Sequence, residues 1–106
     1  MRPVVLAIAM MAAAGIAQSQ SRPPAAQELL HQYKCYICHA DDETKTGPAY
    51  VDVAARYRGN PQAVALVSGV IRKGARSGGP WHMPPHPEIS SRDATTMARY
   101  ILSLKK

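Results

Sequence analysis

The stretch Cys35-Tyr36-Ile37-Cys38-His39 contains both cysteines of the 106-residue chain and a histidine directly after the second one. In a helical turn, side chains three residues apart fall on one face, where both thiols can reach the vinyl groups of one haem and form thioethers. The histidine that follows is then available as a ligand to the iron. The pattern C-x-x-C-H is typical of c-type haem attachment, and we predict a haem site here.

Three other kinds of site also use a pair of cysteines: a redox disulfide, half of a zinc site, and two structural thiols. A thioredoxin-like pair belongs beside a βαβ pattern, which this sequence lacks. A closed zinc site needs four ligands, commonly from two separated pairs, and the sequence has no second cysteine pair. The histidine at position 39 therefore favours haem over these alternatives.

The N-terminal stretch has the outline of a secretory signal peptide. Arg2 precedes an apolar run of fourteen residues from Val4 to Ala17, and polar residues follow. A membrane anchor is the alternative, but this run is shorter than the roughly twenty residues that a helix needs to cross a bilayer. We predict that residues 1–19 are cleaved on export to the periplasm, and that residues 20–106 form a single domain without stable membrane insertion.

The mature chain would be short and basic. A chain of under ninety residues has a thin buried core and often needs additional stabilisation, which covalent haem would provide. Of the 13 Lys and Arg, only Arg2 is in the leader, so 12 remain against 7 Asp and Glu, a charge of +5. Positive charge steers encounter with acidic partners. No basic run is interleaved with aromatic residues, so we do not expect binding of nucleic acid.

Apolar residues at helical spacing predict four short helices. Asn60 is suited to cap the third of them, and residues 90–93 have the spacing of a capping box at the start of the fourth. No stretch shows convincing strand alternation. The fold class is therefore predicted to be all-α, with about four short helices around the haem. The first three helices are expected over residues 26–35, 49–57 and 61–74.

Three acidic residues, Asp41, Asp42 and Glu43, follow the haem motif directly. Such a run could bind a cation. Adjacent carboxylates in a loop are more often solvated, and we expect that here.

The Gly- and Pro-rich stretch 74–87 supplies the candidates for a second iron ligand. The occupant of the sixth coordination position separates an electron carrier from a protein that handles oxygen or peroxide. Outside the leader the only thioethers are Met83 and Met97, and Met97 lies on the inward face of the last helix, where a core role is expected. Met83 stands beside two prolines that restrict the backbone. We predict Met83 as the ligand, with His82 and His86 as its competitors.

Together, CYICH at 35–39, KTGPAY at 45–50, WHMPPH at 81–86 and a final amphipathic helix resemble a small bacterial monohaem class I cytochrome c. The resemblance covers essentially the whole mature chain. It implies an all-α electron-transfer fold in which the first and last helices cross. The crossing would pair the face of Leu29, Leu30 and Tyr33 with Tyr100 and Ile101.

The resemblance also implies how the cofactor is held. Thioether bonds from Cys35 and Cys38 would attach one haem c. The iron would be bound by His39 Nε2 on one side and by Met83 on the other. Pro48 would accept a hydrogen bond from His39 Nδ1–H, which would fix the orientation of the ring and make the histidine a better donor.

One departure from the family pattern concerns Trp81. Relatives commonly place several residues between the loop tryptophan and the ligand methionine, whereas here only His82 separates Trp81 from Met83. Contact of Trp81 with a haem propionate is therefore one of two hypotheses. In the other, the indole packs on the haem edge as apolar cover.

By resemblance, the expected function is periplasmic transfer of one electron at a time, without enzyme activity. The partners would be a redox donor and a redox acceptor, with a dehydrogenase and a terminal oxidase as the candidate classes. The alternative is a cytochrome c subunit that receives electrons from the catalytic partner subunit of an oxidoreductase complex. A thiol-disulfide catalyst and a peroxide-handling haem protein are two further hypotheses, and Met83 argues against the last.

Overall fold

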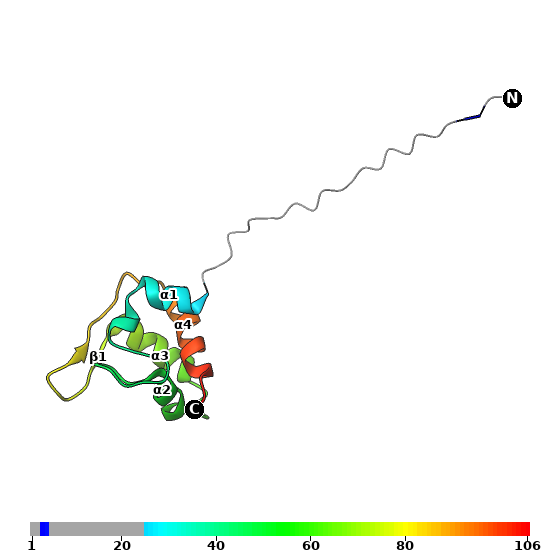
Figure 1. Cartoon of the computed structure of the whole chain (residues 1–106). Helices are drawn as coiled ribbons and strands as arrows, with labels where there is room; N and C mark the ends of the chain where they lie inside the picture. Colours follow the sequence, from blue (N-terminus) through cyan, green and yellow to red (C-terminus); the bar gives the residue numbers. More distant parts are fainter. Residues whose placement is uncertain (1–2, 5–24) are drawn as a thin grey trace.

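The computed structural model describes residues 3–4 and 25–106. The predicted signal peptide therefore lies outside the described residues, except for positions 3 and 4. Within the described part, no helix has the length and apolar character needed to span a membrane. The elements, shown in Figure 1, are α1 (Ala26–Gln32), η1 (Cys35–Ile37), α2 (Tyr50–Arg56), α3 (Ala63–Lys73), β1 (Ala75–Arg76), β2 (His82–Met83) and α4 (Ser91–Ser103).

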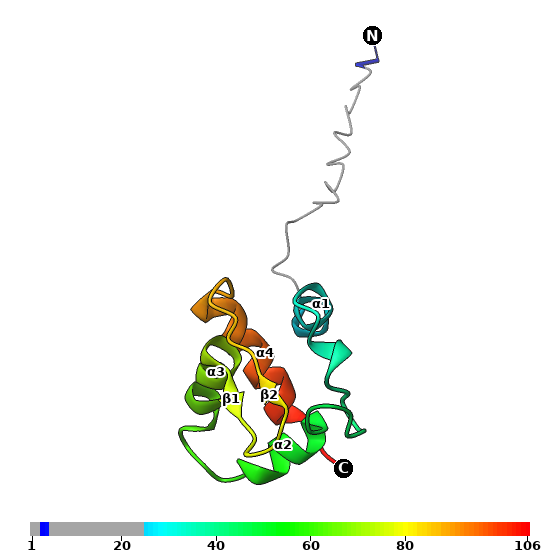
Figure 2. The same ribbon diagram turned by 90° about the vertical axis from the view of Figure 1, so that its left-hand side faces the viewer.

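Helix α4 is the centre of the domain and contacts α1, α2 and α3. In Figure 2 it lies between α1 and α3. Its first turn is capped as predicted, because Ser90 Oγ accepts a hydrogen bond from Asp93 N at 3.0 Å. The mainly helical fold predicted from the sequence is thus confirmed, with α4 as the element on which the other helices pack.

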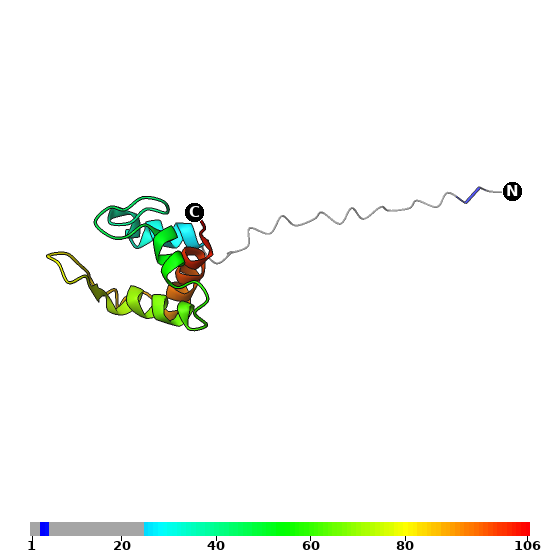
Figure 3. The ribbon, with the colours of Figure 1, turned by 90° about the horizontal axis from the view of Figure 1, so that it is seen from below.

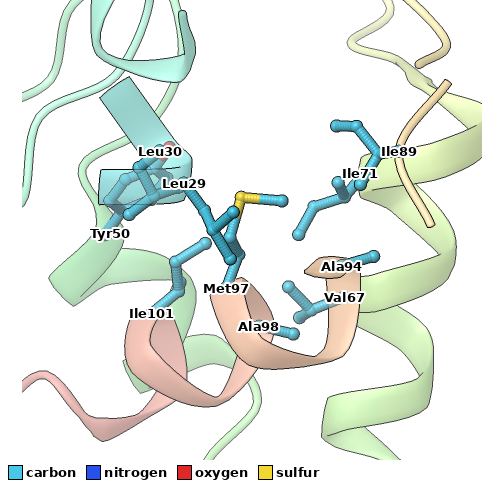
Figure 4. Close-up of a cluster of buried hydrophobic side chains, with 10 residues drawn as sticks. All are labelled: Leu29, Leu30, Tyr50, Val67, Ile71, Ile89, Ala94, Met97, Ala98 and Ile101. Carbon is cyan, nitrogen blue, oxygen red and sulfur yellow. The ribbon is translucent and has the colours of Figure 1, made fainter. Parts of the chain in front are cut away.

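The core forms where the apolar faces of these helices meet, and Figure 4 shows its side chains. Met97 of α4 is completely buried, which confirms its predicted core role. Its side chain lies between residues of α1 and residues of α3. Buried α4 residues recur at intervals of three and four, the spacing of one helix face. The core consists of Leu29, Leu30, Tyr50, Val67, Ile71, Ile89, Ala94, Met97, Ala98 and Ile101.

Helix α1 crosses α4, as the family resemblance implied, and polar side chains link both ends of the crossing. Near the end of α1, Tyr33 Oη donates to Asp93 Oδ2 at 3.0 Å. Near its start, Gln27 Nε2 donates to Tyr100 Oη at 2.8 Å. The start of α1 therefore lies toward the C-terminal half of α4. Tyr33 meets the first turn of α4, and Tyr100 meets the opposite end of α1.

The prediction that the first helix runs into Cys35 is wrong. Helix α1 ends at Gln32, and Lys34 adopts a left-handed conformation with φ of 62°. A residue in this conformation cannot continue a right-handed helix, so the chain changes direction there. The cysteines then lie on a separate short 3₁₀ turn, η1, and are not a continuation of the α1 face.

The third helix also begins later than predicted. Asn60 Oδ1 accepts from Gln62 N at 2.8 Å, but this bond closes a turn ahead of the helix. Helix α3 starts at Ala63 and has no side-chain cap. Gly74 ends it with φ of 76°, as the glycine predicted.

A short antiparallel hairpin follows α3 in a region where no strand was predicted. Ala75 pairs with Met83 and Arg76 with His82. Strands of two residues are too short to show alternation in a sequence. Gly74 is needed at the base of the hairpin, because a Cβ atom there would lie 2.5 Å from Met83 O.

Candidate haem-binding site

The histidine segment, defined here as residues 35–49, begins with η1 and continues as a loop that is closed by backbone hydrogen bonds. His39 N donates to Cys35 O at 3.0 Å, and Gly47 N donates to Cys38 O at 2.7 Å. The start of α2 is bonded to the same segment, because Tyr50 N donates to Ala40 O at 2.9 Å. His39 is therefore held on a backbone that is bonded both before and after it.

Both cysteines are half-buried, and neither forms a disulfide. Cys35 packs against the core, and burial raises the pKa of its thiol, an effect that a hydrogen bond with Tyr50 partly opposes. Catalytic cysteines instead have a lowered pKa that exposes a thiolate. Among the described residues there is also no group of three or more potential metal-binding side chains. The geometry therefore favours neither a thiol-disulfide catalyst nor a zinc site.

The His39 ring is oriented by two contacts. Its Nδ1 lies 2.8 Å from the carbonyl oxygen of Pro48, the contact that the family resemblance implies. Its ring also stacks on Tyr50, with centroids 4.9 Å apart and planes 20° apart. A carbonyl oxygen can only accept, so Nδ1 carries the proton and Nε2 of the neutral ring keeps a free lone pair. This is the tautomer that an axial ligand to haem iron requires.

Gly47 forms a cradle for this ring, a role that the sequence analysis missed. A Cβ atom at position 47 would lie 2.7 Å from His39 Nδ1 and 2.8 Å from Nε2, closer than side chains approach one another. The signal available in the sequence was the turn formed by Gly47 and Pro48, which says nothing of an imidazole packed against it.

Replacing Gly47 by alanine is expected to displace the His39 ring and to lower the free energy of unfolding by about 1–3 kcal/mol, as overpacking does. Urea unfolding measures this loss. The matched control is Gly69→Ala in α3, where an added Cβ meets no atom within 4 Å of the described structure and helix propensity favours alanine. Equal stability of the two variants would contradict the cradle.

Met83 lies on the second arm of the site, the β1–β2 hairpin. Its side chain is half-buried and packs against the same core as Cys35. Figure 3 shows the histidine segment and the hairpin as two arms that extend from the same side of the helices. Neighbouring strand residues point to opposite faces, so His82, which is exposed, points away when Met83 points toward the core. This geometry favours Met83 over His82, although ligation itself stays a prediction.

The segment after Met83 is fastened to the end of α3. His86 N donates to Arg72 O at 3.0 Å, and Arg72 Nε donates to Ile89 O at 3.0 Å. His86 Nδ1 is buried and has no hydrogen-bond partner within the described residues. A buried polar atom without a partner costs about 1–3 kcal/mol. The His39 tautomer is the feature of this site that suits a bound haem.

Trp81 is exposed, whereas the predicted ligands His39 and Met83 are half-buried. Its side chain is 68% exposed and does not join the core. Neither of its two hypothetical roles is favoured by a contact, so both stay predictions.

The acidic run differs from its predicted solvated state at one position. Asp42 and Glu43 are exposed, as expected, but Asp41 is half-buried and accepts hydrogen bonds from Tyr36 and Tyr100. The bond to Asp41 is the main cause that raises the pKa of Tyr100. Burial, followed by the same carboxylate, raises the pKa of Tyr36 well above its usual range.

Comparisons with known proteins show the family of this chain. The family model described as Cytochrome c matches residues 24–105. Cytochrome c-552 of Hydrogenobacter thermophilus is 38% identical over 81 residues, which cover 74% of this chain and 81% of the relative. Cytochrome c-551 of Pseudomonas aeruginosa is 41% identical over 80 residues, covering 74% and 76%.

A solved structure shows the same arrangement of the chain. The crystal structure of Nitrosomonas europaea cytochrome c552 superposes with a TM-score of 0.71 at 34% identity, covering 74% of this chain and 99% of that one. The resemblance that CYICH, KTGPAY and WHMPPH predicted is thereby confirmed.

Proposed function

This chain belongs to the cytochrome c family, and from that premise we propose that it is a periplasmic carrier of single electrons with His39 and Met83 as axial ligands of its iron. Its cofactor is haem c, attached covalently. The only two thiols of the chain, Cys35 and Cys38, stand in the C-x-x-C-H motif that supplies this attachment.

The observation that carries the proposal is the contact of His39 with Pro48. Bound haem supplies an iron that cycles between two oxidation states. The chain supplies a histidine whose Nδ1 is engaged at 2.8 Å by a carbonyl oxygen, which leaves Nε2 to bind and strengthens it as a donor. Met83 supplies a soft thioether, which favours the reduced iron over the oxidised iron.

We propose that the protein transfers electrons without catalysing a reaction of its own. Its relatives are cytochromes c-551 and c-552, and their kind of protein works with redox partners. A donor such as a dehydrogenase and an acceptor such as a terminal oxidase fit this role. Electron-transfer encounters use small, weak interfaces, in which the charge of +5 on the mature chain, from 12 Lys and Arg against 7 Asp and Glu, would raise the rate of encounter more than the affinity.

The test is spectroscopy of the protein purified from the periplasmic fraction. A pyridine haemochrome spectrum should show thioether-linked haem, and both oxidation states should be low-spin because both axial positions are filled. Electron exchange with an acidic redox protein should slow as salt is added, because screening weakens charge steering. A haemochrome without thioether links would overturn the assignment. Rates that do not depend on salt would remove the role of charge.

A further inference from the structure

The Asp41 carboxylate is bonded directly to two elements of the domain, and a third is linked to it through Tyr100. Its Oδ1 accepts from Tyr36 Oη of η1 at 2.9 Å, and its Oδ2 accepts from Tyr100 Oη of α4 at 2.5 Å. Gln27 Nε2 of α1 donates to the same Tyr100 oxygen at 2.8 Å. Both oxygens of Asp41 are therefore used, and the donors come from the turn before it and from the crossing of α1 and α4.

The backbone of Asp41 is bonded as well as its side chain. Val51 N of α2 donates to Asp41 O at 2.9 Å, next to the bond between Tyr50 N and Ala40 O. The main chain here thus ties the histidine segment to α2, and the side chain ties it to α4. Asp41 stands two residues after His39, so the link to α4 is made beside that imidazole.

Aromatic rings connect Asp41 to the His39 imidazole. Tyr50 stacks on His39, and Tyr36 lies against Tyr50 with centroids 5.9 Å apart. The Tyr36 hydroxyl is bound by Asp41, so the carboxylate also fixes the outer ring of this group. The His39 ring is therefore held in two ways. Pro48 engages its Nδ1. Its stacked face rests on Tyr50, which in turn contacts the Tyr36 ring that Asp41 holds.

We propose that Asp41 is a positioning residue of the haem site, which fastens the histidine segment to the α1–α4 crossing and so holds the His39 ring at a fixed orientation. This inference rests on the proposed ligation by His39. It assigns a role to one member of the acidic run, because charge-assisted hydrogen bonds at 2.5 and 2.9 Å are stronger than neutral ones. The neighbouring carboxylate, Asp42, is exposed and makes no such link to any other residue in the part of the chain that the structure describes.

The two adjacent carboxylates allow a matched experiment on the haem-loaded protein. Asp41→Asn and Asp42→Asn remove the same charge one residue apart, but only Asp41→Asn takes an acceptor away from the tyrosine hydroxyls. We expect Asp41→Asn to lower the thermal midpoint by about 4 °C or more and Asp42→Asn to leave it unchanged. The g-values of the low-spin ferric iron, which report the orientation of its axial ligands, should change in Asp41→Asn alone. The reduction potential should move further in Asp41→Asn than in Asp42→Asn.

Tyr100→Phe is a milder variant that removes one of the two donors. It should reproduce part of each change, and it should add little when combined with Asp41→Asn, because groups that share one hydrogen bond are not additive. Equal g-values and potentials in Asp41→Asn and Asp42→Asn would overturn the proposal, even if only Asp41→Asn is less stable, since Asp41 would then be merely structural. A wild-type protein whose iron is not bound by His39 would instead overturn the proposed function.

Discussion

Replacing both Cys35 and Cys38 by alanine is expected to leave the chain largely unfolded when it is purified without haem. The described core contains ten buried residues, and several of the larger side chains around it, including those of Tyr36 and Met83, are only partly buried against it. Total stability of a small domain is about 5–15 kcal/mol. Loss of the apolar group that covers this side of the core is expected to remove most of it.

Far-UV circular dichroism and urea unfolding measure this effect. The single variants Cys35→Ala and Cys38→Ala are graded controls, because each keeps one thioether link and should retain haem and most of the helical signal. A haem-free double variant with near-native dichroism and a cooperative urea transition would show that the helices pack without the cofactor. In that case the fold would be stable without the haem.

Replacing Met83 by alanine is expected to lower the reduction potential and to convert the iron from low-spin to high-spin. The thioether is the ligand that favours reduced iron, so its loss should lower the potential by about 0.1 V or more, within the ~0.8 V that axial ligands span. Absorption spectroscopy reports the spin state, and a redox titration reports the potential.

Met97→Leu is the matched control for this variant, because it removes the other thioether of the mature chain. Met97 is completely buried in the core, and a volume-conserving change there should cost less than about 1.5 kcal/mol and leave the iron low-spin. An unchanged potential and spin state in Met83→Ala would mean that another residue is the ligand. His86 would then be examined before His82, because His86 carries a buried nitrogen without a partner among the described residues and His82 is exposed.

The elements predicted from the sequence differ from the structure mainly at their ends. The apolar stripe of α1 is visible in the sequence, but its end at Gln32 depends on the left-handed Lys34, a residue type that carries no turn signal. The β1–β2 hairpin has only two residues in each strand, so periodicity could not predict it. The capping of α4 by Ser90 was predicted correctly because its hydrogen bond joins residues three apart.

Some residues of the candidate site are recognisable from the sequence, and others are found only in the structure. His39, the two cysteines and Met83 are recognisable because the residue types themselves carry the chemistry of haem attachment and iron ligation. Gly47 and Asp41 were missed as site residues. The role of Gly47 depends on an imidazole eight positions earlier that folds back onto it, and the role of Asp41 depends on a tyrosine 59 positions later.

The sequence by itself determined the cofactor and its attachment, because two thiols and an imidazole within five residues meet one haem through local geometry alone. Only the tertiary structure decided which of three adjacent carboxylates is bound. The crossing of α1 and α4 brings the hydroxyl of Tyr100 to Asp41 and leaves Asp42 exposed. The chemistry of a side chain follows from its residue type. Contacts between residues far apart in the sequence depend on how the helices cross, and that crossing is set by packing of the whole core.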